Sequence, residues 1–145
     1  MKDTMISIYE QFSKADRYIV GFVYRKSLYM TTCDHINPDL LTVEQASRNQ
    51  GDNLRLRIRK AHKEMLVSES VCLGSADLLT ADKYNKGELF EKAVTEYYGQ
   101  VWVKDNIPFY VQGDIRINGV EIQIKLDGAT LLNSKMMVKL AGMAA

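Results

Sequence analysis

Apolar and polar residues alternate without a break over residues 113–126, on both sides of Asn118-Gly119. Asn-Gly is the strongest sequence signal for a two-residue hairpin turn, because both central residues of a type I′ turn need a positive φ. Such a turn places Asp114 opposite Gln123, and paired residues share a face of the sheet. One face then carries Ile115, Ile117, Val120, Ile122, Ile124 and Leu126. The other face carries Asp114, Arg116, Glu121, Gln123 and Lys125, and it is either solvated or a functional site.

The rest of the pattern predicts an α+β fold with a mixed sheet. Helical spacing of apolar residues predicts helices over 4–15, 76–81 and 87–98, and a last helix that begins at 133 or 134. Thr42 and Gln45 match a capping box, which predicts a short helix over 42–49. Runs of β-branched and aromatic residues predict strands over 18–24, 28–32, 69–73 and 100–104. We expect one compact unit in which residues 1–84 contribute strands and residues 85–145 form a helix–strand–hairpin–helix core.

Residues 53–59 alternate strictly and predict a half-buried strand. Leu54, Leu56 and Ile58 lie on one side of it, and Arg55, Arg57 and Arg59 lie on the other. Arginine suits planar, bidentate contact with phosphate, so these residues and the following Lys60 form a candidate nucleic-acid-binding ridge. The alternative is a solvated edge strand whose charges discourage pairing with other edges.

Composition adds few constraints. The chain has 145 residues, of which 46% are hydrophobic and 26% charged, and its net charge is +1, so no overall field favours nucleic acid or a membrane. The sequence contains no apolar run as long as a membrane span, and its start lacks the features of a secretory signal. Cys33 and Cys72 have no metal-binding spacing, so we expect free thiols and a cytoplasmic protein of a bacterial host.

The helix predicted over 87–98 carries two acids beside its apolar stripe. Glu88 and Glu91 are three residues apart, so they lie one turn from each other. A carboxylate at a helix N-terminus is stabilised by the helix dipole, which is a sufficient structural reason for Glu88. The dipole explains Glu91 less well.

A helix acid, a strand beginning at Asp114, a tight turn, a strand carrying Gln123-x-Lys125 and a final helix follow one another. This order resembles the core of the PD-(D/E)XK nuclease superfamily, especially its small Holliday-junction resolvases and restriction enzymes. Residues 85–92 and 123–125 also resemble small proteins of Gram-positive phages and mobile elements. The resemblance implies that Glu91, Asp114 and Gln123 hold Mg²⁺ or Mn²⁺. It implies that these three residues and Lys125, which supports the attacking water, are catalytic.

The chain departs from that superfamily in three respects. Gly113 stands where proline is usual, and Gln123 stands where an acid is usual, which removes one negative charge from the metal site. The superfamily also closes its sheet with a strand after the second helix, so a strand from the first half would have to fill that place.

These features favour a metal-dependent nuclease, or a nuclease-like nucleic-acid-binding protein, of a phage or mobile element. The alternative is a non-enzymatic binding protein that inhibits a host defence complex. The expected partners are nucleic acid, a host protein complex, or a second copy of the chain through an exposed strand or the helix with Met136 and Met137. We expect no membrane partner.

Overall fold

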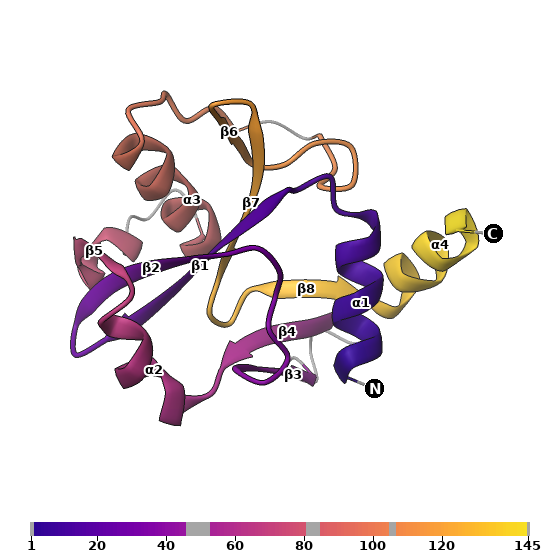
Figure 1. Ribbon diagram of the computed structural model, residues 1–145, viewed down its shortest axis with the longest axis horizontal. Coiled ribbons are helices and arrows are strands. Elements are labelled where there is room, and N and C mark those ends of the chain that lie inside the picture. The colour runs from indigo at the N-terminus through magenta and orange to yellow at the C-terminus, as the bar shows by residue number, and fades with distance from the viewer. Residues whose placement is uncertain (1, 46–52, 81–84, 105–106, 145) are drawn as a thin grey trace.

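The computed structural model describes residues 2–45, 53–80, 85–104 and 107–144 (Figure 1). The predicted α+β class is confirmed. A curled, mixed five-stranded sheet has the order β5-β2-β1-β7-β6, and a smaller sheet has the order β3-β4-β8. The large sheet consists of β1 (Arg17–Tyr24), β2 (Ser27–Cys33), β5 (Val71–Ser75), β6 (Ile115–Ile117) and β7 (Val120–Leu126). The small sheet consists of β3 (Leu41–Gln45), β4 (Asn53–Ile58) and β8 (Thr130–Asn133).

The predicted hairpin is confirmed between β6 and β7. Asn118 and Gly119 have φ values of 50° and 82°, as the two-residue turn requires, and Arg116 faces Glu121 across it. Asp114 lies just outside the strand ladder. Its backbone N–H donates to the Ile122 carbonyl at 2.9 Å, and its Oδ2 accepts from the Ile124 N–H at 2.8 Å. A side-chain oxygen thus takes the place of a backbone acceptor, and β6 begins at the next residue, Ile115.

β7 is a central strand because β1 pairs with it in parallel. Tyr18 lies beside Gln123, and Val20 lies beside Lys125. A strand from the first half of the sequence therefore fills the place next to the Gln123-x-Lys125 strand, and Figure 1 shows the two crossing the middle of the sheet together. With a neighbour on each side and cover on both faces, β7 has no fully solvated face.

Two buried clusters cover the two faces of the large sheet. The cluster on one face, here called the α3 face, joins α3 (Lys86–Tyr97) to the sheet through Ile19, Leu28, Met30, Leu89, Phe90, Val94, Ile115, Ile122, Ile124 and Leu126. The cluster on the other, the α1 face, joins α1 (Lys2–Phe12) and the small sheet to it through Ile6, Tyr9, Tyr18, Val20, Phe22, Leu41, Leu56, Ile58 and Leu131. Gly21 lies under α3, where a Cβ would come within 2.1 Å of Phe90 Cζ.

The small sheet corrects two predictions. Residues 41–45 form β3, so the helix predicted over 42–49 is wrong for 42–45, and its remainder lies outside the described residues. Pairing of all five β3 residues with β4 overrides the local capping signal of Thr42 and Gln45. β4 is confirmed as a strand, but it lies between β3 and β8 and is not an edge. β8 was not predicted.

The other elements follow the sequence more closely. α2 (Lys60–Val67) and α4 (Ser134–Ala144) are helices, and the predicted helix after Ser75 is a short 3₁₀ turn, η2 (Ala76–Leu79), capped by the Ser75 hydroxyl, which accepts from the Asp77 N–H at 3.2 Å. The strand predicted over 100–104 is wrong, because that segment forms no ladder and is held by side chains. Among the described helices, none is both long and apolar enough to cross a membrane.

Candidate functional site

The polar side of β7 is enclosed under α1. Gln123 is 2% exposed, and Tyr9, which α1 contributes to the same cluster, is 0% exposed. Lys125 follows two residues after Gln123 on the same side of the strand. It retains some exposure as a whole residue, but its ammonium group is buried. These side chains form a cluster of polar groups beside an otherwise apolar layer, which we call the α1 chamber and define by Tyr9, Asp114, Gln123 and Lys125.

Asp114 and Gln123 meet within the α1 chamber, where the exposed Asp114 contacts the buried Gln123. The Gln123 Nε2 donates to Asp114 Oδ2 at 2.6 Å, so the hairpin register brings the two side chains together although Asp114 lies outside the ladder. The Gln123 Oε1 is buried, and no described residue donates to it. Because Asp114 accepts from Nε2, this arrangement turns the amide oxygen away from that bond as an open acceptor.

Lys125 is the cation of the chamber. Its Nζ lies 5.3 Å from the centre of the Tyr9 ring, a cation–π distance. Burial lowers the pKa of Lys125 from its ordinary value of 10.5, while the carboxylates of Asp114 and Glu91 act in the opposite direction. Both predicted site acids are therefore close enough to Lys125 to act on its charge.

Tyr9 belongs to the α1 chamber, and sequence reasoning assigned it only to the apolar stripe of a helix. Its ring stacks on Phe109 with the ring centres 4.8 Å apart, and its buried hydroxyl has no partner among the described residues. Burial raises the pKa of Tyr9 well above its ordinary value, and the negative charge of Asp114 adds to that effect. The only sequence signal was the residue type, because a tyrosine on a buried stripe brings a hydroxyl that needs a partner.

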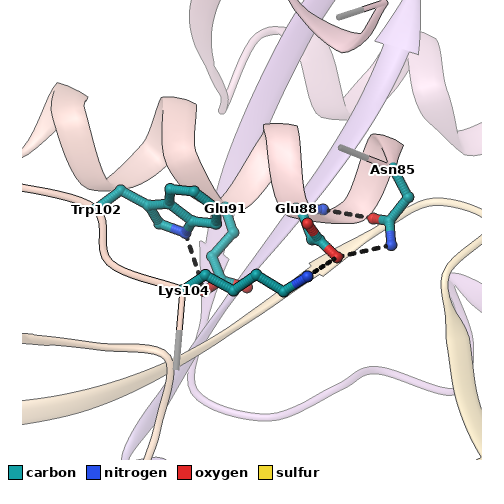
Figure 2. Close-up of polar contacts among 5 residues, drawn as sticks. All are labelled: Asn85, Glu88, Glu91, Trp102 and Lys104. Carbon is teal, nitrogen blue, oxygen red and sulfur yellow. Dashed lines mark hydrogen bonds and ion pairs between the residues drawn. The ribbon is translucent and has the colours of Figure 1, made fainter. Parts of the chain in front are cut away.

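Glu91 lies on α3, where its charge acts on Lys125, and it is held by the segment after that helix. The Trp102 Nε1–H donates to Glu91 Oε1 at 3.3 Å, and Figure 2 shows the indole above the glutamate. Glu88 has a different environment. Its carboxylate lies 3.2 Å from Lys104 Nζ and accepts from Asn85 Nδ2 at 3.1 Å.

The contacts at the start of α3 give Glu88 a purely structural role. Asn85 caps the helix, because its Oδ1 accepts from the Glu88 N–H at 2.8 Å (Figure 2). Two hydrogen bonds join Glu88 to Asn85 at the start of the helix, and an ion pair joins it to Lys104. Glu88 therefore links the start of α3 to the 100–104 segment. Glu91, one turn later, is the α3 acid that acts on Lys125.

The predicted arginine ridge runs along β4 and into the residue that follows it. Arg55 and Arg57 both belong to β4, but Arg59 lies beyond the strand as the residue before α2, and Lys60 begins that helix. Arg59 nevertheless keeps an extended backbone, with φ −60° and ψ 131°, and its N–H donates to the Leu40 carbonyl at 3.1 Å, so the row of three guanidinium groups stays a prediction. Arg57 Nε lies 3.8 Å from Asp127 Oδ1, which ties this row to the end of β7.

The described residues include no group of three or more His, Cys, Asp or Glu side chains suited to a metal ion. The oxygen donors near Lys125 are the carboxylates of Asp114 and Glu91 and the amide oxygen of Gln123. Two carboxylates and one amide carry less negative charge than a three-acid site, so any cation there would bind more weakly.

No protein-family model matches the chain, and searches of curated proteins and of solved structures also yield no match.

Proposed function

We propose that this protein is a nuclease-like nucleic-acid-binding protein, of the kind found in phages and mobile elements, that cleaves phosphodiester bonds at the α1 chamber. The observation that carries the proposal is the buried Gln123 amide, whose Nε2 is bonded to Asp114 and whose Oε1 has no partner beside a buried lysine. Buried polar groups without partners are rare in protein interiors and point to a missing ligand or a catalytic role.

The donor set fits a hard divalent cation, though weakly. Asp114, Glu91 and the open Gln123 Oε1 would hold Mg²⁺ or Mn²⁺, which both accept carboxylate and amide oxygens. When bound, such a cation polarises a phosphate and lowers the pKa of a coordinated water. The orphaned Oε1 supports this assignment, because a cation would give that oxygen the partner that the protein does not supply.

The chain's own residues have separate roles in this proposal. Lys125 donates a hydrogen bond to a phosphate oxygen or orients the attacking water, and its lowered pKa eases proton exchange with that water. Asp114 fixes the Gln123 amide through Nε2, so that Oε1 keeps one orientation. The fully buried Tyr9 ring contacts the Lys125 ammonium group and keeps bulk water away from it.

The test measures cleavage of labelled single- and double-stranded DNA and of RNA in Mg²⁺ or Mn²⁺. We expect D114N and K125M to abolish cleavage, because each removes a reacting charge while keeping side-chain volume. We expect Q123E to strengthen the stabilisation of the protein by Mg²⁺ in thermal unfolding, since it adds a third carboxylate. The matched control is R116Q, which removes an exposed charge from the same hairpin.

Equal cleavage by wild type, D114N and K125M would show that the activity arises elsewhere and would refute the proposed site. Absence of cleavage by wild type under all of these conditions would refute the hydrolytic part of the proposal. A Q123E protein that Mg²⁺ stabilises no more than wild type would refute the assignment of Gln123 as a ligand.

A further inference from the structure

A second polar cavity lies at the end of β7, next to the first turn of α3. Its volume is about 330 Å³. It is lined by Arg55, Arg57, Lys86, Gly87, Leu126, Asp127, Gly128 and Ala129. Three different parts of the chain thus contribute: β4, the start of α3 and the turn between β7 and β8. We call it the β7-end cavity.

The β7-end cavity is positively charged. Arg55, Arg57 and Lys86 line it against one carboxylate, Asp127. That carboxylate is already used on the α2 side, because its Oδ1 accepts from the Ile58 N–H at 2.8 Å and its Oδ2 lies 2.9 Å from Lys63 Nζ. Asp127 also pairs with Arg57 at 3.8 Å, but the lining still holds three cationic side chains against this one carboxylate, although the net charge of the whole chain is only +1.

The turn at Gly128 is shaped around one of these cations. A Cβ at Gly128 would lie 2.8 Å from Arg57 Nη1, and the residue has a φ of +91°, which favours glycine. The turn is also bonded to β4, because Gly128 donates to the Leu56 carbonyl at 2.8 Å and Leu56 donates to the Ala129 carbonyl at 3.0 Å. The guanidinium groups are therefore carried by a sheet that the turn braces, which limits reorganisation on binding.

The start of α3 adds to the field of the same cavity. Lys86 and Gly87 are its first residues, so the positive end of a twelve-residue helix faces the guanidinium groups. The Asn85 side chain satisfies the Glu88 N–H and not those of Lys86 or Gly87. Arginine and lysine side chains that line one concave site bind an anion better than the same side chains spread over a flat surface.

We propose that the β7-end cavity binds one backbone phosphate of a nucleic-acid strand. Leu126, which lines the cavity, belongs to the cluster on the α3 face of β7, whereas Lys125 points to the α1 face, so this contact is separate from the α1 chamber. This inference rests on the proposed function for its ligand class, but it concerns binding and does not require cleavage. It replaces the linear ridge predicted from the sequence, because Arg55 and Arg57 act together with Lys86 and not with Arg59 and Lys60.

The experiment measures the salt dependence of binding of a short labelled single-stranded oligonucleotide with 5′-hydroxyl ends, in EDTA. The first variants are R55Q/R57Q and K86Q. The matched control is R59Q/K60Q, which removes the same two charges as R55Q/R57Q from exposed positions outside the cavity. We expect each lost phosphate contact to lower the log–log salt slope by about 0.7 for a single strand.

The expected result is weaker binding and a lower slope for R55Q/R57Q and K86Q, with the control close to wild type. Inorganic phosphate should compete better than chloride of equal ionic strength, because the cavity recognises the phosphate itself. Equal losses in the cavity variants and the control would overturn the inference in favour of a diffuse field. Absence of binding by wild type at low salt would overturn it as well.

K86Q keeps the test decisive if R55Q/R57Q fails to fold, since Lys86 is exposed on the first helical turn. The two proposals fail separately. Cavity variants that bind and cleave like wild type would refute the cavity and leave the α1 chamber standing. Wild-type binding through the cavity without cleavage would do the reverse.

Discussion

The two faces of β7 are built on different principles. On the α3 face, Ile122, Ile124 and Leu126 meet the buried side of α3, which is apolar apart from Thr95. On the α1 face, the same strand places the buried Gln123 and the buried ammonium group of Lys125 among apolar residues. An unsatisfied buried polar group costs about 1–3 kcal/mol, so the α1 face gives up stability that the α3 face does not. Both faces carry a buried apolar cluster, and the α1 face also encloses polar groups that the packing alone does not require.

The largest effect should come from the apolar face. Phe90 is fully buried against Gly21, so we expect F90A to lower the free energy of unfolding by about 3–5 kcal/mol. Urea unfolding followed by circular dichroism measures this change. A loss below 1 kcal/mol would show that the α3 face is not the main source of stability.

A double-variant cycle sharpens the same point. In wild type, G21A forces a methyl group into the Phe90 ring, with a Cβ 2.1 Å from Cζ, and should be severely destabilising. In the F90A background the ring is gone, so the same substitution should have a much smaller effect. Equal losses in both backgrounds would mean that Gly21 is needed for its backbone and not for space.

On the α1 face, a polar-to-apolar change should act in the opposite direction. We expect Q123L to raise the free energy of unfolding by roughly 1 kcal/mol, because it removes the unpartnered Oε1. Asp114 keeps the Ile124 N–H as a donor, so it is not orphaned. Urea unfolding tests the sign, and a clear loss of stability would show that the Gln123 amide is structural.

Lys125 gives the comparison a pH dependence. Its pKa is lowered in the folded protein from 10.5, so between the folded value and 10.5 the unfolded chain binds more protons. Stability from this residue therefore rises with pH over that window. We expect wild type to gain stability relative to K125M as the pH is raised from neutral towards 10.5. Parallel stability curves for the two proteins would contradict the burial of the ammonium group.

The smallest effect belongs to the exposed end of the same polar row. Arg116 Nε lies 3.1 Å from Glu121 Oε1, but the arginine side chain is 68% exposed. We expect R116Q to change the free energy of unfolding by less than about 1 kcal/mol, as for other solvated ion pairs. Urea unfolding in low and high salt measures this change. A larger loss of unfolding free energy that does not depend on salt would show that the pair is shielded from solvent.

Local signals predicted the fold where neighbours in sequence are neighbours in space. The turn at Asn118-Gly119, the register of Arg116 with Glu121 and the cap at Ser75 are all short-range. The helix predicted at Thr42 failed because pairing with β4 is decided by residues that the local pattern does not contain. The strand β8 was missed for the same reason.

The candidate site was predictable in part. Periodicity alone placed Asp114 next to Gln123, and the hydrogen bond between them agrees with it. Enclosure of Lys125 was not predictable, because the polar alternation of a hairpin is the same whether solvent or α1 covers it. Tyr9 and Lys86 were missed because each comes from an element distant in sequence from the residues that it meets.

The parallel pairing of β1 with β7 also sets the order in which the chain can fold during synthesis. β1 ends at Tyr24 and β7 begins at Val120, so roughly 100 residues separate their emergence from the ribosome. At about 5–20 residues per second, β1 waits on the order of 5–20 s for its partner. Until then the β1–β2 hairpin exposes an unpaired edge that can recruit other strands. We therefore expect this edge of the nascent hairpin to need protection until β7 has been made.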